Sequence, residues 1–532
     1  MHFMNRKSPF VLLLALVMCF SAVAQKRRPR SAARTTSNAS KQAAPTKPGE
    51  AAAQPAPTPV PAPTSDSPTL AIVNDTSFTA SDIEPAVSEI ILNDPDLYLH
   101  DFYQDRAKAI REARQRAVDA RISSMLITAE AKKRNMTTDA FLGAEVNGKI
   151  AAPTDAEVRN VFDSNRAQLG DDYDRARPTI INYLRNERAE KARDELVNRL
   201  KMTNTVMKGA DVNAPNLAPG TVIGSVNGQP LRVETINERM KAYVYKMERR
   251  IYEAQRDALD RRINNTLITA EANKKNIGSE QILRTEVTDK VKPPTDAEIS
   301  KFYEDNKSRI NGDLASSRSQ IAEYLAQQQQ QKLEQDLATR LRAGAKVQDF
   351  LKEPTPPVFN VAVGKGYGRG DINSTVKIVE FTDFQCSACG GMYPVIEDVL
   401  KSYGNRVYFE IRNFPLTSVH ENAFAAAEAA AAANAQGKLW PYIDFLFKNQ
   451  TSLDTDSLKK YATQVGLDRK RFDADFESGK FDADIRRDVE EGEVYGIEGT
   501  PTIFINGVML TTLSADGLRE AIEKAFARAP KN

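Results

Sequence analysis

The sequence predicts a multidomain chain in which a mainly α, duplicated module precedes a C-terminal α/β domain. Three observations support this prediction. The chain has 532 residues, more than one hydrophobic core usually organises. A stretch in its first half recurs at a constant offset and has the apolar spacing of helices. Finally, the strand-like run at residues 376–381 is followed by a C-x-x-C motif and then by helical spacing, the order of an α/β unit.

The N-terminus has the pattern of a cleavable signal peptide over residues 1–24. Two basic residues precede the apolar run Phe10–Phe20, which is short for a membrane-spanning helix. Val23 lies between two alanines, a small-x-small cleavage site, so the mature chain is predicted to begin at Gln25 in the periplasm or on the extracytoplasmic face. An uncleaved anchor is an alternative. A lipoprotein attached through Cys19 is disfavoured, because a bulky methionine precedes that cysteine.

Composition restricts the remaining possibilities. Residues 25–69 are rich in Ala, Pro, Thr and Ser without an apolar period, which predicts a disordered linker. The chain has 73 basic and 71 acidic residues, a net charge of +2, so we expect no nucleic-acid partner.

An internal repeat follows the linker. ISSMLITAEAKKRN from Ile122 recurs as INNTLITAEANKKN from Ile263, and PTDAEV from Pro153 recurs as PTDAEI from Pro294. The offset is 141 residues in both cases. A constant offset over so long a stretch indicates duplication of one supersecondary unit.

The repeats are predicted to be helical. Ile122, Leu126 and Ala129 have i, i+4, i+7 spacing, which places them on one helix face. Thr154 and Glu157 have the spacing of a capping box. We assign repeat 1 to residues 70–206, repeat 2 to residues 221–345 and a proline-rich linker to residues 346–357. A spacer of stacked helices and a surface that holds other chains both fit this pattern.

Cysteine usage points to the site that carries chemistry. The chain has three cysteines, and Cys19 would leave with the signal peptide, so the exported protein keeps Cys386 and Cys389. The apolar period after them is helical, so C-x-x-C opens a helix, where free N–H groups and the helix dipole lower the pKa of the first thiol. The i, i+3 spacing brings the second sulfur alongside, ready to resolve a mixed disulfide.

Two other interpretations of this pair are weaker. A zinc site needs about four ligands, and outside the signal peptide the chain offers only these cysteines with His100 and His420. We therefore expect no metal. A structural disulfide in so short a loop would stabilise the fold by only about 2 kcal/mol. Redox chemistry is the favoured interpretation.

A second element supports redox chemistry. Thr500 and Pro501 precede the strand-like run at residues 503–505, and Asn506-Gly507 is a hairpin turn signal. Proline is tolerated at the start of a strand, and a cis peptide bond there would mark a deliberate feature.

Together these motifs resemble the DsbA family. The residues that carry the resemblance are EFTDFQCSAC, NFPLTSVHENAFAAAEAA, QGKLWPYIDFLFKNQ and GIEGTPTIFINGV, in that order, within residues 358–532. The resemblance implies a thioredoxin fold with an inserted helical subdomain at Val419–Glu493. It also implies a redox-active Cys386–Cys389 disulfide and no other cofactor.

The resemblance further assigns roles to five residues. Cys386 would be the exposed, attacking thiol and Cys389 the buried, resolving thiol. Thr500 and Pro501 would form the cis-proline loop, which lies beside the disulfide and binds substrate backbone, so we predict that the bond between them is cis. Glu380 would be the buried acid that assists proton transfer and tunes the redox pair.

One departure from the family leaves the direction of electron flow open. Oxidising members often have Pro-His between the cysteines, and the histidine stabilises the thiolate. Here the pair is Ser387-Ala388, without a positive charge. His420 is interpreted as a packing or capping residue.

The duplicated region resembles the N-terminal chaperone module of SurA. The resemblance lies in a VNG strand, a helix ending in LITAEAxKxN and the pattern PTDAEIxxxYxxN. Only about 17 residues separate Asn306 from Tyr324, too few for an inserted isomerase domain.

The sequence as a whole therefore predicts an extracytoplasmic thiol–disulfide oxidoreductase with a chaperone-like client-binding module. Its expected partners are unfolded exported proteins and a membrane or periplasmic redox partner. The alternative is a non-enzymatic periplasmic holdase whose redox domain is regulatory or vestigial. Thiol titration separates them, because a holdase needs no low-pKa cysteine.

Overall fold

The computed structural model describes residues 67–528 except 137, 171, 308–309, 311 and 418. The predicted signal peptide (1–24), the start at Gln25, Cys19 and most of the predicted linker (25–69) lie outside the described residues. Within that described part, no helix has the length and apolar character needed to cross a membrane.

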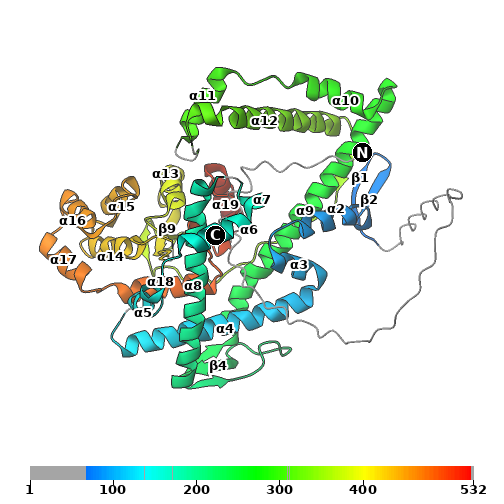
Figure 1. Cartoon of the computed structure of the whole chain (residues 1–532). Coiled ribbons are helices and arrows are strands. Elements are labelled where there is room, and N and C mark those ends of the chain that lie inside the picture. The colour runs from blue at the N-terminus through cyan, green and yellow to red at the C-terminus, as the bar shows by residue number, and fades with distance from the viewer. Residues whose placement is uncertain are drawn as a thin grey trace, which may run out of the picture. The chain divides into compact units, whose positions relative to one another are not determined.

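Repeat 1 opens with a β-hairpin and continues into helices, as Figure 1 shows in blue to green. Its elements are β1 (Thr69–Val73), β2 (Thr76–Thr79), α2 (Ala80–Leu92), α3 (Leu97–Gln104), α4 (Arg106–Lys133), α5 (Thr138–Glu145), α6 (Asp155–Ser164), α7 (Arg166–Leu169), α8 (Tyr173–Thr203) and β3 (Val206–Lys208).

Repeat 2 has the same order of elements, except that one long helix stands in place of α2 to α4 and the described residues form no counterpart of α7. Its elements are β4 (Val222–Val226), β5 (Gln229–Arg232), α9 (Val233–Lys275), α10 (Ser279–Glu286), α11 (Asp296–Asn306), α12 (Leu314–Ala343) and β6 (Val347–Asp349). In Figure 1, α11 runs alongside α12. The predicted helical character of both repeats is confirmed.

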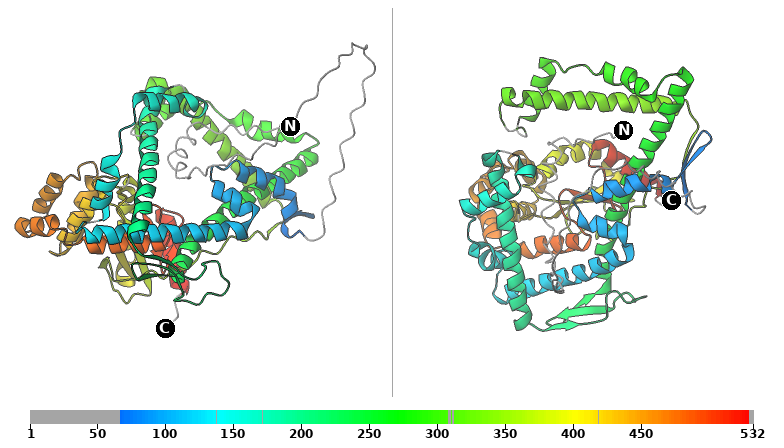
Figure 2. Two further views of the ribbon diagram at one scale, coloured as in Figure 1. Left: turned by 60° about the horizontal axis from the view of Figure 1, so that its bottom comes forward. Right: turned by 45° about the vertical axis from the view of Figure 1, so that its right-hand side comes forward.

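The apolar periodicity and the caps explain these helices. Leu126 on α4 is fully buried, and it packs in one core with Leu196 and Leu200 of α8, the two long helices seen in Figure 2. Thr154 and Glu157 form the predicted capping box at the start of α6. The box satisfies N–H groups that the first turn leaves without partners.

The repeats exchange their last strands. β1 pairs with β2 and with β6, whereas β4 pairs with β5 and with β3, so the strand that ends each repeat completes the hairpin of the other. β6 lies inside the segment 346–357 that the sequence predicts as a linker. That prediction was incomplete, because the pairing of Val73 with Val347 is far too long-range to leave a local signal.

The exchange also shapes the compact units of the chain. One unit contains residues 67–100 and 251–353, and the other contains residues 101–250 and 354–528. These units cut across the repeats, and the predicted repeat boundaries stay a prediction.

The C-terminal part is an α/β domain built on a mixed sheet. The strand order is β11-β10-β8-β9-β7, and β8 and β9 are parallel. Its strands and the two helices that pack near them are β7 (Tyr367–Arg369), β8 (Val376–Thr382), β9 (Val407–Asn413), β10 (Thr502–Ile505), β11 (Val508–Met509), α13 (Ser387–Lys401) and α19 (Ala515–Arg528). The predicted α/β class of this region is confirmed.

Alternation along β8 gives the sheet two buried faces. Ile378 belongs to the larger core, with α13 and α19, and Phe381 belongs to a second core on the opposite face. The last of the helices inserted between β9 and β10 packs with the second core through Val489 and Val494, and the others complete the larger core. These helices lie in the region 419–493 expected for the insertion, and the last of them ends one residue beyond it. They are α14 (Ala423–Asn434), α15 (Leu439–Lys448), α16 (Thr455–Gln464), α17 (Arg469–Glu477) and α18 (Asp482–Val494).

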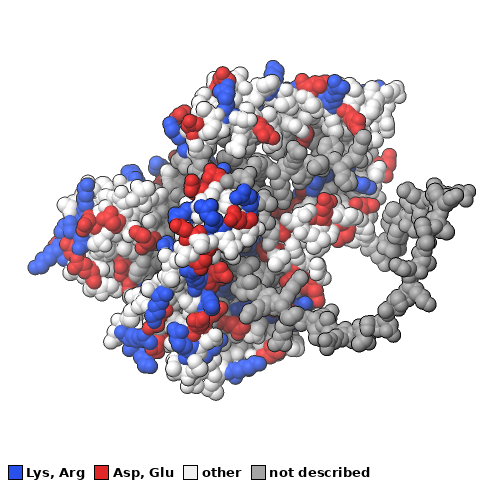
Figure 3. Space-filling model, in the orientation of Figure 1, with Lys and Arg blue, Asp and Glu red and all other residues white. Residues whose placement is uncertain are grey.

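The described surface carries both signs of charge. On the face shown in Figure 3, basic and acidic side chains are interspersed rather than gathered into one patch. This agrees with the nearly balanced composition.

Candidate active site

The C-x-x-C motif lies where β8 ends and α13 begins. Cys386 is the N-cap of α13, and its extended backbone (φ −70°, ψ 120°) turns the chain from the loop into the helix. The Cys386 N–H donates to the Asp383 carbonyl (3.1 Å), and the Gly390 N–H donates to the Cys386 carbonyl (3.0 Å). The first thiol is thus held at the N-terminus of a helix, as the sequence predicts.

Both described cysteines are free thiols, and both are buried. Cys389 is 0% exposed and Cys386 is 8% exposed. Cys386 was expected to be exposed, and that expectation was wrong, although Cys386 is the more exposed of the two cysteines. The thiol of Cys386 lies against the Thr500 carbonyl, to which it donates at 3.4 Å, and this contact covers it.

The environment separates the two thiols by acidity. A hydrogen bond from the Cys389 thiol is the largest effect that lowers the pKa of Cys386, which reaches about 5 although burial opposes it. The Cys389 and Ala388 N–H groups and the Thr500 hydroxyl also favour its thiolate. Burial, followed by the hydrogen bond to Cys386 and the charge of Glu380, raises the pKa of Cys389.

The Thr500–Pro501 loop reaches the cysteines because β10 follows it directly. β10 pairs with β8, and Thr502 stands opposite Phe381. The Thr500–Pro501 peptide bond is cis, as predicted. Substrate binding by this loop remains a prediction.

Glu380 lies on β8, two residues from the end of the strand. The alternation of β8 places it on the same face as Ile378, the face that α13 covers. Its side chain is buried, and burial raises the pKa of Glu380 to about 7. Its Oε2 atom has no hydrogen-bond partner in the described part of the chain. An acid that titrates near neutrality beside Cys389 can accept or donate a proton there.

Gln450 is a further site residue that the sequence did not reveal. It follows α15, and its amide donates to the carbonyls of Phe384 (3.0 Å) and Cys386 (2.7 Å). A Cβ at Gly390 would lie 2.2 Å from the Gln450 side-chain oxygen, so glycine leaves room for this clamp. Gln450 ends the motif QGKLWPYIDFLFKNQ, which was the available signal.

A second contact fixes the loop before the cysteines. His420 Nδ1 lies 2.8 Å from Asp383 Oδ2, and the same carboxylate accepts from the Leu416 N–H (2.9 Å). The Gln385 side chain accepts from the Asn422 N–H (2.8 Å). His420 therefore ties the insertion to the active-site loop, in keeping with a packing or capping role. Over the described residues, no group of three or more His, Cys, Asp or Glu could hold a metal ion.

A family comparison agrees with this geometry. Residues 363–524 match the family model described as "Thioredoxin". The C-terminal domain is thioredoxin-like.

Curated relatives match over part of their length. The Na(+)/H(+) antiporter NhaA 1 of Mycolicibacterium vanbaalenii is 32% identical over 169 residues, which cover 31% of this chain and 27% of the antiporter. NhaA 3 of Salinispora tropica is 36% identical over 162 residues, which cover 30% of this chain and 25% of the antiporter. The chain thus spans about a quarter of the length of these relatives. The names of these relatives assign Na(+)/H(+) antiport to those proteins.

Solved structures are similar to a comparable share of the chain. A thioredoxin-like oxidoreductase from Silicibacter pomeroyi is 23% identical, covers 31% of this chain and 95% of its own, and has a TM-score of 0.29. Oxidised BdbD from Bacillus subtilis is 19% identical, covers 33% of this chain and 100% of its own, and has a TM-score of 0.30.

Proposed function

We propose that this protein is an extracytoplasmic thiol–disulfide oxidoreductase that exchanges disulfides with unfolded exported proteins. The observation that carries the proposal is the unequal acidity of two adjacent thiols at a helix N-terminus. The pKa of Cys386 is lowered to about 5, while that of Cys389 is raised. Such a pair suits a thiol that exchanges and a thiol that resolves.

The exchange would begin with the Cys386–Cys389 disulfide. A client thiolate attacks the sulfur of Cys386, the disulfide breaks, and Cys389 leaves with the electron pair and takes a proton from Glu380. A second client thiolate then attacks the client sulfur of the mixed disulfide, and Cys386 leaves as a thiolate. The client loses two electrons and the cysteine pair gains them. The low pKa makes Cys386 a good leaving group.

The same acidity favours the oxidising direction. A stabilised thiolate makes the reduced pair more stable, and this raises the reduction potential. In this domain the stabilisation comes from the Cys389 thiol, the helix N-terminus and Thr500. These groups act where the oxidising relatives often use a histidine. A membrane or periplasmic partner would reoxidise the pair.

The helical repeats would hold the client near the thiols. Tethering a binding surface to a catalyst raises the effective concentration of the bound chain without changing chemistry at the sulfur. The resemblance to a chaperone module supports this part of the proposal. A holdase without redox function would need no lowered thiol pKa, so the acidity of Cys386 argues against that alternative.

Thiol titration of the full chain tests the proposal. The rate of Cys386 alkylation is measured against pH in the wild type and in the Cys389→Ala variant. We expect this rate to rise with the fraction of Cys386 that is ionised, with a midpoint near pH 5 in the wild type. Cys389→Ala should raise that midpoint, because it removes the strongest donor to the thiolate. A wild-type midpoint near that of an ordinary cysteine, together with no oxidation of a dithiol peptide, would disprove the proposed function.

A further inference from the structure

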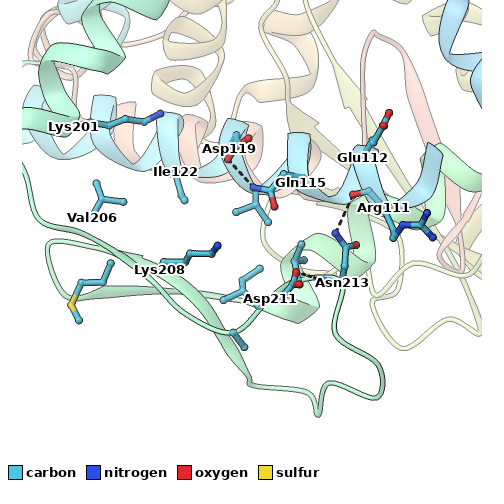
Figure 4. A pocket seen from close by; sticks show the side chains of 15 residues that line it. Arg111, Glu112, Gln115, Asp119, Ile122, Lys201, Val206, Lys208, Asp211 and Asn213 are labelled. Atoms are coloured by element: carbon cyan, nitrogen blue, oxygen red, sulfur yellow. Dashed lines mark hydrogen bonds between the residues drawn. The ribbon is translucent and has the colours of Figure 1, made fainter. Parts of the chain in front are cut away.

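The groove beside the long helix of repeat 1 has a mixed lining. Figure 4 shows this groove between α4 and β3, and its volume is about 710 Å³. Cations and carboxylates both line it: Arg111, Lys201 and Lys208 together with Glu112, Asp119 and Asp211. The groove therefore indicates no single class of ligand. A more specific arrangement lies beside the thiols, where Gln450 meets the active-site loop.

One amide group of Gln450 binds two carbonyls of that loop. Its Nε2 atom donates to the Phe384 carbonyl (3.0 Å) and to the Cys386 carbonyl (2.7 Å). An amide nitrogen of this kind has two hydrogens, so both are used on the loop. The Cys386 carbonyl also accepts from the Gly390 N–H (3.0 Å), the first hydrogen bond of α13. Gln450 thus binds the carbonyl from which the helix begins.

The packing of α15 fixes where Gln450 lies. Phe447 of α15 contacts Phe384 of the loop (5.4 Å between ring centroids) and Tyr393 of α13 (4.7 Å). The Tyr393 hydroxyl donates to Asp444 of α15 (2.8 Å). These contacts hold the end of α15 against both α13 and the loop. The side chain two residues beyond α15 therefore approaches the loop from a fixed direction.

Two adjacent glycines of α13 differ in what they leave room for. A Cβ at Gly390 would lie 2.2 Å from Oε1 and 2.7 Å from Cδ of Gln450. A Cβ at Gly391 would meet nothing within 4 Å among the described residues. Glycine inside a helix is less favourable than alanine. At position 390 the space for Gln450 gives this unfavourable residue a steric reason.

The Cys386 carbonyl matters because it sets the direction of the first turn of α13. Cys386 is the N-cap, so its side chain lies where the N–H groups of the second and third helical residues, Ala388 and Cys389, point. Those two N–H groups favour the Cys386 thiolate. A carbonyl held by Gln450 keeps its tilt relative to the helix, and the N–H groups that follow it stay aimed at the sulfur.

We propose that Gln450 is a positioning residue for disulfide exchange, which holds Cys386 in the N-cap geometry that stabilises its thiolate. Gln450 acts through the two carbonyls that it binds. The inference rests on the proposed function, since the Cys386 thiolate is the group that leaves in that exchange. It gives the inserted helices a part in the chemistry, because the end of α15 then controls how readily the thiolate leaves.

The first test uses Gln450→Met in the full chain, which keeps the length of the side chain and removes both donors. The rate of Cys386 alkylation is measured against pH. We expect the midpoint to rise by about one pH unit, the effect of about one hydrogen bond to the thiolate. Cys389, which donates to Cys386, and Glu380, whose charge acts on Cys389, are unchanged in every variant. A midpoint equal to that of the wild type would overturn the proposal.

Gly390→Ala and Gly391→Ala form a matched pair that leaves Gln450 itself intact. The new Cβ at position 390 displaces the flexible end of Gln450, so the midpoint should rise as in Gln450→Met. Gly391→Ala is the control and should keep the wild-type midpoint. In the Gln450→Met background Gly390→Ala should add little, because the contact that it breaks is already absent. Equal shifts in the two glycine variants, or additive shifts in the double variant, would overturn the proposal.

Oxidation of a small dithiol by the same proteins separates this inference from the proposed function. A wild type that exchanges disulfides, with no shift of midpoint in Gln450→Met, overturns the role of Gln450 alone. A wild type with the midpoint of an ordinary cysteine and no exchange overturns the proposed function itself. A raised midpoint in Gln450→Met, together with a lower reduction potential against glutathione, supports both, because a less stable thiolate makes the reduced pair less stable.

Discussion

The thioredoxin-like domain and the helical repeats place their charged groups differently. The domain buries charges: Arg412 donates to Asp488 (2.7 Å) and Glu491 (2.9 Å) with its own side chain 0% exposed. The repeats keep most charged side chains at the surface around several small cores, as the pair Arg261–Asp257 illustrates. Buried, paired charges give the thiols a rigid framework. The small, separate cores of the repeats instead leave much of each long helix exposed to solvent.

The largest expected effect is a variant of the thioredoxin-like domain that loses disulfide exchange while the repeats keep their binding of clients. Cys386→Ser should lower the rate of disulfide exchange at least about a thousandfold, because it removes the exchanging thiolate. It should leave affinity for an unfolded client peptide unchanged, because the repeats contain no cysteine. Cys389→Ser should accumulate mixed disulfides, seen by non-reducing electrophoresis. A loss of peptide affinity in the Cys386→Ser variant would break the division.

Buried and exposed charges should differ in their effect on stability. Arg412→Met removes the shortest ion pair of the buried Asp488 and leaves it a longer one with Arg487 (3.5 Å), so the free energy of unfolding should fall by about 3 kcal/mol. Fluorescence of Trp440, the single tryptophan, reports on this domain alone. Arg519→Met in the same domain breaks exposed pairs with Asp398 and Asp516 and should change stability by less than about 1 kcal/mol. Similar losses in both variants would contradict the comparison.

Glu380 makes the stability of the domain depend on pH. Its folded pKa of about 7 lies above the ordinary value of 4.5, so its contribution is fully present below pH 4.5 and is lost as pH rises through about 7. At pH 8 the ionised, buried carboxylate should cost about 3 kcal/mol. Glu380→Gln should therefore stabilise the domain at pH 8 and change it little at pH 4, followed by denaturant unfolding of Trp440 fluorescence. A variant that gains nothing at pH 8 would refute the raised pKa.

The smallest effect concerns the helix caps of the repeats. Thr154→Ala and Thr295→Ala each remove a capping box and should lower the stability of the helical module by about 1 kcal/mol. Far-ultraviolet circular dichroism follows this transition. Trp440 fluorescence should not change in Thr295→Ala, because Thr295 and Trp440 lie in different compact units, and a shift in it would show that the two units unfold together.

Local patterns predicted much of the fold and part of the site. The spacing around Ile122 and Ile263 predicted helices, and the position of Cys386 before a helical period predicted its place at a helix N-terminus. The cis bond before Pro501 followed from the family resemblance that this motif carries. These features depend on neighbours in the chain, so the sequence displays them directly.

Features that depend on distant partners were not predicted. Gln450 contacts Phe384 and Cys386 across more than 60 residues, and the motif that it ends does not indicate which residues its amide contacts. The family resemblance implied an exposed Cys386, and the contact with Thr500 that covers it also joins distant parts of the chain. The strand β6 was assigned to a linker for the same reason.

The exchange of β3 and β6 has a consequence for how such a module can arise. A single copy of the repeat would carry a hairpin whose third strand must come from another copy. Two identical copies would satisfy each other by a twofold-symmetric swap, which is a low-barrier route to a homodimer. Joining the copies in one polypeptide makes the swap intramolecular and frees each half to diverge. Arg256 and Asp349 form an ion pair in repeat 2, whereas Gln115 and Lys208 occupy the matching positions of repeat 1, 141 residues earlier. Two identical copies could not have had this difference.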